Sequence, residues 1–372
     1  MRLATATLHS YRLPLRAPWL TAGASLGERC GWLLCLQDDN GRRGYGECAP
    51  LPGSGGDPAA ALRALQSLLP PLIGLAARAA LRQLAPGSDG QVPAARCAVE
   101  TALLDLLAQD SGLPLAAYLN GARRRPAAGA APPPPIRLNA ACGSLAGICE
   151  ADLRAACSAG FEVLKLKVGV LAIDEEIALL RQLATVLPPA CQLRLDANRA
   201  WPAAAAARFL HACADLPIEM VEEPLAAPDI DRLQALQAGT TIAIAVDESI
   251  RRLGSQALIV RRAVRRLVIK PPRHGGLLPA LALARRAGSA GVECIITSSL
   301  DSACGITAAA HLAAALDNRL AHGLATSAWL SEDTGSPPTI SSGQLLLDAS
   351  PGLGFVPDRK RLFVPPGGLY CR

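Results

Sequence analysis

The sequence predicts an α/β fold: a (β/α)8-type barrel with an N-terminal α+β capping domain, which the C-terminal tail completes. The first observation is a set of short apolar, β-rich segments between residues 163 and 272. Each has charged residues at or near its end: VLKLKV, LRLDAN, MVEEP, IAVDES and LVIKPP. Runs of this kind, bounded by turn-forming residues, are typical of buried strands.

The second observation is the even spacing of these segments. Successive intervals are 29, 26, 25 and 23 positions, counted along Lys167, Asp196, Glu222, Asp247 and Lys270. Each interval accommodates one strand, one helix and two loops, which is a βα unit. Further strand candidates at residues 136–141, 292–299 and 319–326 bring the number of units to eight. In such a barrel the functional site lies at the C-terminal ends of the strands.

Residues 1–128 are predicted to form the capping domain. We expect a strand over residues 3–13, a loop in PWLTAGASLGERC (18–30), and a hairpin turned at Asp39–Gly41. Residues 59–120 have an apolar pattern of helical period. Two Gly-rich loops, around Thr21–Glu28 and Pro50–Gly56, are expected to close the barrel mouth.

The remaining boundaries follow from composition. Residues 129–135 end in four consecutive prolines and are predicted to be a linker, because proline continues neither a helix nor a central strand. Residues 136–330 are then the barrel. Residues 331–372 return to strand-and-turn composition, and we expect this segment to rejoin the capping domain.

Composition narrows the partners to small molecules. The net charge of +6 comes mostly from scattered arginines without a recognition motif, so we expect no nucleic-acid partner and at most a preference for anionic substrates. The sequence has no uninterrupted apolar run of about 18 residues, so we expect no membrane insertion. The twelve cysteines are irregularly spaced, which favours a reduced, cytoplasmic setting over a disulfide framework. The sequence does not indicate an oligomeric state.

Lysine is rare and concentrated at predicted strand ends. The 37 basic residues comprise 33 arginines and four lysines, and three of these four are Lys165, Lys167 and Lys270. Arginine is effectively never deprotonated, whereas lysine can lose its proton when it is desolvated or lies beside other cations. Because side chains alternate along a strand, Lys165 and Lys167 point to the same side. We therefore expect these amines inside the barrel, in acid/base roles.

Three carboxylates complete the pattern. Asp196, Glu222 and Asp247 end successive strands, and such a set suits a hard cation, Mg²⁺, with Mn²⁺ as a substitute. A cation on a substrate carboxylate would stabilise the enediolate left by loss of the α-proton, and a neighbouring lysine can be the base. A single acid at a strand end is more often a cap or turn residue. The joint order Lys–Asp–Glu–Asp–Lys favours the catalytic interpretation.

The motifs KLK, LRLDAN, VEEP, VDES and VIKP resemble those of the enolase superfamily, specifically its muconate-lactonizing branch. The similarity covers nearly the whole chain, including GYGECAPLPG and RCAVETALLDLLA in the capping domain. It implies an enolase-like barrel with a Lys base and Mg²⁺. By position, Lys167 would be the acid/base, Lys165 its electrostatic neighbour and Lys270 the amine facing the other side of the substrate. The metal ligands would be Asp196, Glu222 and Asp247.

Within this branch, three segments most resemble the o-succinylbenzoate synthases of menaquinone and phylloquinone biosynthesis: LRLDANRAW, ITSSLDSACG and HGLATSAWL. The seventh predicted strand ends without the His base of mandelate-racemase-like members. The resemblance implies a lyase, more specifically a hydro-lyase. It would convert 2-succinyl-6-hydroxy-2,4-cyclohexadiene-1-carboxylate to 2-succinylbenzoate by syn-dehydration, with Lys167 removing the α-proton and returning it to the leaving hydroxyl.

Substrate contacts and alternatives stay open at this point. Candidate substrate-binding residues are Asn198, Arg194, Gly275, Ser298 and Ser299, although the serines could equally cap the following helix. Alternative activities in the same class are N-acylamino acid racemisation, dipeptide epimerisation and muconate-type cycloisomerisation. A non-catalytic barrel scaffold is the alternative from another class. Burying so many charges would gain a scaffold nothing, which counts against it.

Overall fold

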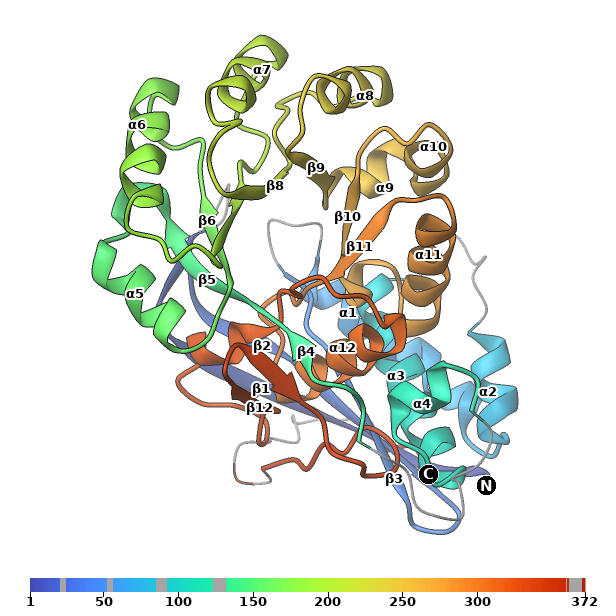
Figure 1. Cartoon of the computed structure of the whole chain (residues 1–372). Coiled ribbons are helices and arrows are strands. Elements are labelled where there is room, and N and C mark those ends of the chain that lie inside the picture. The colour runs from blue at the N-terminus through green and yellow to red at the C-terminus, as the bar shows by residue number, and fades with distance from the viewer. Residues whose placement is uncertain are drawn as a thin grey trace.

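A curved sheet of parallel strands forms the centre of the molecule (Figure 1). The computed structural model describes residues 1–20, 25–51, 56–84, 92–122, 132–358, 360 and 370–371. In these ranges the sheet has seven strands, in the order β11-β10-β9-β8-β7-β6-β5. Their bounds are β5 Asn139–Ser144, β6 Val163–Lys167, β7 Gln192–Asp196, β8 Ile218–Glu222, β9 Ala243–Val246, β10 Arg266–Ile269 and β11 Glu293–Ile296.

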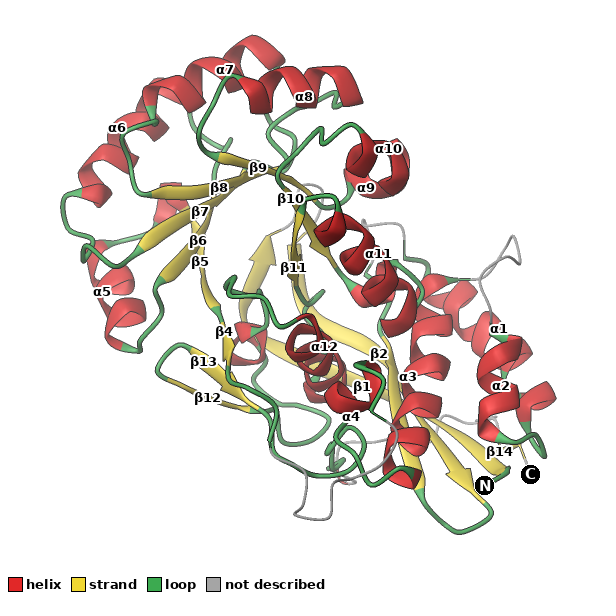
Figure 2. Ribbon diagram, turned by 45° about the vertical axis from the view of Figure 1, so that its right-hand side comes forward, coloured by secondary structure: helices red, strands yellow, loops and turns green. Residues whose placement is uncertain are grey.

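Helices cover the convex side of this sheet (Figure 2). They are α5 Glu150–Ser158, α6 Ile173–Ala184, α7 Ala203–Ala212, α8 Ile230–Ala238, α9 Ser249–Leu253, α10 Ser255–Val260, α11 Leu277–Ser289 and α12 Ala303–Leu316. Each strand is thus followed by at least one helix, as the spacing predicts. Every pairing within the sheet is parallel.

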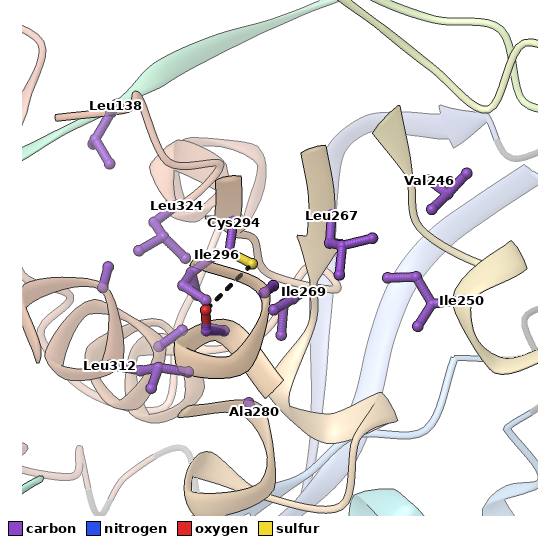
Figure 3. Close-up of a cluster of buried hydrophobic side chains, with 14 of the residues drawn as sticks. Leu138, Val246, Ile250, Leu267, Ile269, Ala280, Cys294, Ile296, Leu312 and Leu324 are labelled. Carbon is purple, nitrogen blue, oxygen red and sulfur yellow. Dashed lines mark hydrogen bonds between the residues drawn. The ribbon is translucent and has the colours of Figure 1, made fainter. Parts of the chain in front are cut away.

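Alternation along the strands separates the core from the site. Leu267 and Ile269 of β10 belong to the main hydrophobic cluster beneath the helices, together with Ile296 of β11 (Figure 3). The intervening residues Val268 and Ile295 belong to a small separate cluster and line the inner side. Because the period is two, the charged residues near the strand ends project to this inner side.

The predicted eighth strand is not a strand. Within residues 319–326, only single bridges form: His322 pairs with Leu138, and Gly323 pairs with Thr297. Both bridges are parallel, so this segment lies between the end of β11 and the start of β5. The chain then turns into a 3-10 helix, η4 (Ala325–Trp329), which prevents a longer ladder.

A second, antiparallel sheet combines three N-terminal strands with one C-terminal strand, in the order β14-β1-β2-β3. Its strands are β1 Leu3–Leu20, β2 Ser25–Asp38, β3 Arg43–Cys48 and β14 Tyr370–Cys371. The hairpin turn at Asp39–Gly41 is confirmed, and Gly41 has a φ of 79° there. The predicted loop over 18–30 was wrong, because β1 and β2 stay paired as far as Leu20 and Ser25. Residues 21–24 lie outside the described residues.

Helices of the capping module pack against this sheet. They are α1 Pro58–Leu68, α2 Ala77–Gln83, α3 Pro93–Asp110 and α4 Leu115–Leu119, with a 3-10 turn η1 at Pro70–Leu72. Strand β3 lies directly on α3: a Cβ on Gly46 would come within 1.9 Å of the Ala98 carbonyl oxygen. The glycines of the GYGEC motif are therefore needed for this close approach.

Two buried acids of the capping module bind the first turns of α11 and α12. Glu47 in β3 accepts hydrogen bonds from the backbone N–H groups of Ser302 (2.9 Å) and Gly305 (2.7 Å). Glu100 in α3 accepts one from Leu278 N–H at 3.0 Å. Negative charge is stabilising at helix N-termini, where N–H groups lack intrahelical partners. These contacts fix the capping module against the carboxyl end of the sheet.

Two buried arginines bind the loops that precede the same helices. Arg29 in β2 donates to the carbonyl oxygen of Leu300 at 3.1 Å and to that of Pro50 at 2.9 Å. Arg96 in α3 donates to the carbonyl oxygen of Gly275. The loops after β10 and β11 are therefore held from the capping side.

The C-terminal segment contacts both parts of the molecule. Strand β12 (Thr339–Ser341) pairs with β13 (Gln344–Leu346), and β13 pairs in turn with β4 (Ile136–Arg137), which precedes β5. Farther on, β14 pairs with β1. Of the predicted linker, 132–135 has no regular structure and 129–131 lies outside the described ranges. The domain boundaries themselves remain a prediction. No described helix combines the length and apolarity needed to cross a membrane.

Candidate active site

One large cavity opens at the carboxyl ends of the parallel strands. Its volume is about 910 Å³. The structure brings all the predicted site residues into its lining: Lys165, Lys167, Arg194, Asp196, Asn198, Glu222, Asp247, Lys270, Gly275, Ser298 and Ser299. They come from the three strands β6, β7 and β8 and from the loops after β7, β9, β10 and β11, so only the fold makes them neighbours.

Lys165 lies between two of the carboxylates. Its Nζ is 2.9 Å from Asp196 Oδ2 and 2.7 Å from Glu222 Oε2. Strand register explains this, because Lys165 and Asp196 lie on adjacent strands and Asp196 is paired with Glu222. Burial lowers the pKa of Lys165, but the two carboxylates outweigh burial and raise it overall. Lys165 therefore stays charged and acts as a counter-ion.

Burial and like charge act on the carboxylates themselves. Burial first, and then the charge of Asp196, raise the pKa of Glu222 to about 8, although Lys165 opposes this rise. Burial likewise raises the pKa of Asp247 against the effect of Lys270. Both acids are almost fully enclosed, so additional positive charge in the cavity would stabilise their ionised forms.

Lys270 stands at the other end of this row. Its ammonium contacts Asp247 Oδ2, and Arg273 approaches the same carboxylate at 3.5 Å and Glu248 at 3.2 Å. Burial is the largest single effect and lowers the pKa of Lys270, but the charges of Asp247, Glu248 and Glu222 together raise it overall. Burial raises the pKa of Glu248, whereas Lys270 and Arg273 together lower it to about 2.

Lys167 differs from the other two lysines because its pKa is lowered. Burial is the largest cause, and the charges of Lys165 and Lys270 add to it, against the opposing effect of Asp196. Its Nζ also lies 5.3 Å from the centre of the Trp19 ring. Lys167 is therefore the amine in this cavity that loses its proton most readily.

Glu223 supports the site without facing the cavity. It has a φ of 47°, which turns its side chain away from the position of Glu222. Its carboxylate accepts hydrogen bonds from Asp247 N–H (2.8 Å) and from Ser249 N–H and Oγ (2.8 and 2.6 Å). Glu223 thus fixes the backbone that carries Asp247.

The three carboxylates fit Mg²⁺ in the chemistry of their donors. Asp196, Glu222 and Asp247 offer the oxygen atoms that this ion prefers, at the carboxyl ends of the successive strands β7, β8 and β9 around one cavity. No three His, Cys, Asp or Glu side chains in the described ranges are grouped closely enough to hold a metal ion. The ammonium groups of Lys165 and Lys270 contact the carboxylate oxygens instead. Metal binding would therefore require these contacts to rearrange.

Two of the predicted substrate-binding residues, Arg194 and Ser299, have contrasting surroundings. The buried Arg194 directs its guanidinium to Glu219 (2.6 and 2.8 Å), Asn139 (2.8 Å) and the Ala321 carbonyl (3.0 Å), so it holds the cavity floor. Ser299 Oγ, in contrast, is buried without a hydrogen-bond partner among the described residues. An unsatisfied buried hydroxyl is costly, which makes Ser299 the stronger candidate for a substrate contact.

The other three candidates line the cavity in different ways. Ser298 Oγ is 2.6 Å from Thr326 Oγ1. Gly275 has a φ of 78°, and its carbonyl oxygen accepts from Arg96. Asn198 has a φ of 45°, and its N–H donates to Asp196 Oδ1 at 3.1 Å. Their roles in binding remain predictions.

Sequence reasoning missed several residues of the cavity wall. Trp19 and Trp329 lie edge to face, with ring centres 4.8 Å apart, although β1 and η4 are distant in sequence. Arg199, Arg251 and Arg273 also line the cavity. Arg273 could have been found from its position three residues after Lys270. The two tryptophans carry no such local signal.

Comparison with known proteins agrees with this geometry. A family model described as Enolase C-terminal domain-like matches residues 149–361, and one described as MenC, N-terminal domain, matches residues 2–69. The o-succinylbenzoate synthase of Thermosynechococcus vestitus is 33% identical over 81% of this chain and 86% of its own length. The L-Ala-D/L-Glu epimerase of Bacillus subtilis is 30% identical over 92% of this chain and 94% of its own.

A solved structure extends the similarity to three dimensions. The dipeptide epimerase from Enterococcus faecalis, complexed with Mg and the dipeptide L-Leu-L-Tyr, has a TM-score of 0.81. It is 26% identical, over 95% of this chain and 99% of that one. The first family model alone spans more than half of the 372 residues. This chain is therefore an enzyme that belongs to the enolase superfamily.

Proposed function

We propose that this enzyme is an o-succinylbenzoate synthase, which removes water from 2-succinyl-6-hydroxy-2,4-cyclohexadiene-1-carboxylate to give 2-succinylbenzoate. The observation that carries the proposal is the match of residues 2–69 to the MenC N-terminal domain. This segment contributes Trp19, Pro50 and Leu51 to the cavity wall, so the resemblance extends to residues that would touch the substrate. The o-succinylbenzoate synthase relative matches over most of both chains.

The three lysines would divide the chemistry between them. Lys167, with its lowered pKa, takes the α-proton of the substrate and returns it to the leaving hydroxyl on the same face, so that water departs. Lys270, with its raised pKa, keeps a positive charge on the other side. Lys165 would keep its positive charge against Asp196 and Glu222, which its ammonium contacts. Asp196, Glu222 and Asp247 would hold Mg²⁺, which when bound supplies positive charge beside the substrate carboxylate.

Unpaired arginines support a substrate with more than one carboxylate. Arg199 and Arg251 line the cavity, and neither has an acidic partner within 4.0 Å among the described residues. An exposed guanidinium at a cavity wall can bind a carboxylate in a bidentate manner. The proposed substrate carries a second carboxylate on its succinyl chain.

A second candidate is 1,1-proton transfer on an N-acylamino acid or a dipeptide. The epimerase relative of Bacillus subtilis is 30% identical over 92% of this chain, which supports this reading. Chemically, Lys167 would remove the α-proton from one face, and Lys270 would deliver one to the other face. The same pair of amines therefore serves both reactions.

Steady-state assays on both substrate classes separate these candidates. We expect chelator-sensitive formation of 2-succinylbenzoate, followed by its absorbance. In parallel, an N-succinylamino acid and L-Ala-L-Glu are incubated in deuterium oxide, and α-deuteration is followed by NMR. Rapid deuteration without any dehydration would reverse the order of the two proposals. A Lys167→Ala variant controls for background exchange.

A further inference from the structure

Two cysteines lie close enough to react with each other, at the end of the sheet opposite the active site. Cys157 Sγ, in the last turn of α5, is 3.2 Å from Cys191 Sγ. Cys191 immediately precedes β7, whereas Asp196 ends that strand. All eleven cysteines whose side chains the structure describes are free thiols.

Local hydrogen bonds hold both thiols in position. Gly160 N–H donates to the Cys157 carbonyl at 2.9 Å, which closes the end of α5. Gln192 N–H donates to the Glu162 carbonyl at 2.8 Å, which ties the start of β7 to the same loop. A disulfide has an S–S length of about 2.05 Å, so the sulfur atoms must approach by only about 1.1 Å.

We propose that Cys157 and Cys191 form a reversible disulfide when the protein meets a small-molecule disulfide oxidant. Cys157 is part-exposed, whereas Cys191 is 5% exposed. Cys157 is therefore the more accessible thiol, and as a thiolate it attacks one sulfur of the oxidant, RSSR, which releases one RSH. Cys191 then attacks the Cys157 sulfur of the mixed disulfide and releases the second RSH. The protein loses two hydrogens, and the oxidant gains them.

The cross-link would stabilise the folded protein relative to the unfolded chain. It closes a loop that contains β6 with Lys165 and Lys167, and it reduces the freedom of this loop in the unfolded chain. Both sulfurs lie at the opposite end of the strands from the cavity, so we expect the side chains of the active site to keep their positions. We expect the melting temperature to rise by roughly 2–6 °C, with kcat/KM changed less than about twofold.

The test uses the full-length protein, reduced and then incubated with oxidised glutathione. Remaining thiols are labelled with N-ethylmaleimide under denaturing conditions and counted by intact mass. We expect two fewer labels than the twelve of the reduced chain, and a linkage between the tryptic peptides 155–165 and 182–194. Cys157→Ser should abolish both the linkage and the stabilisation, and Cys30→Ser, at an exposed thiol, should preserve them.

Three results would overturn the proposal. The first is full labelling after oxidation. The second is a linkage of Cys157 to Cys142. The Cys157 thiol is near enough to Cys142 to influence it electrostatically. The third is a loss of activity in the oxidised protein, restored by dithiothreitol, which would show that the cross-link reaches the active site. The first two results need no substrate, and the third is measured with whichever substrate the enzyme turns over.

Discussion

The carboxylate of Glu47 accepts a hydrogen bond from the backbone N–H of Ser302 at 2.9 Å, although 255 positions separate the two residues in sequence. This contact joins the capping module to the first turn of α12. The preceding loop carries Ser298 and Ser299, which line the cavity. The interface between the two parts therefore determines the shape of one cavity wall.

Glu47→Ala is expected to lower the free energy of unfolding by about 2–4 kcal/mol, because it leaves buried N–H groups at Ser302 and Gly305 without an acceptor. Denaturant unfolding at pH 7 measures this. Glu28→Ala is the matched control, since Glu28 makes an exposed ion pair with Arg12 and its loss should cost less than about 1 kcal/mol. Equal effects of the two substitutions would argue against the interface as described.

Lys167→Arg is expected to reduce kcat by about 10²–10⁴-fold, because arginine keeps the positive charge and cannot accept a proton at neutral pH. Thermal unfolding should be little changed, since Lys167 is only partly enclosed. Lys360→Arg makes the same replacement in the C-terminal segment and should leave kcat unchanged. If the Lys167 variant retained near-normal turnover, the base would have to be another residue.

Glu222→Gln is expected to weaken Mg²⁺ binding at least about tenfold, because the ion loses one of three carboxylates. Isothermal titration of chelator-treated protein with MgCl₂ measures the affinity without reference to any substrate. Glu175→Gln, on the exposed surface of α6, serves as the control. An unchanged affinity in the Glu222 variant would remove this residue from the proposed ligand set.

Acid should destabilise the protein through His322. Its Nδ1 accepts a hydrogen bond from Ile296 N–H at 2.9 Å. Burial, with a contribution from the charge of Arg194, lowers its pKa to about 3. An unfolded histidine binds a proton below about pH 6.5, and the folded one does not, so the stability present above pH 6.5 is lost as pH falls toward 3. The loss approaches about 1.4 kcal/mol per pH unit.

Unfolding free energies at pH 7, 6, 5 and 4 test this expectation. His322→Asn should keep an acceptor near the Nδ1 position and make the acid slope shallower. His211→Asn, at an exposed site on α7, should retain the wild-type slope. The buried His311, with a pKa lowered to about 4 by burial, should supply part of the slope in every variant. Parallel curves for all three proteins would contradict the role of His322.

The sequence by itself determined the strands, their order and which residues end them. An apolar run with charges at its end carries its own evidence, because strand propensity and alternation are local properties. For this reason Lys165, Lys167, Asp196, Glu222 and Lys270 were predictable from spacing. There were two exceptions. Residues 319–326 form only single bridges instead of a strand. In residues 18–30, pairing with the opposite strand outweighed the low strand preference of glycine and alanine.

Only the tertiary structure decided what those residues do to one another. Nothing local in Lys167 distinguishes it from Lys165, yet one amine has a lowered pKa and the other contacts two carboxylates. The contact between the rings of Trp19 and Trp329 could not be predicted from the sequence either. The physical reason is that burial and charge–charge energies depend on distance in space, which the chain fixes only when distant segments pack together.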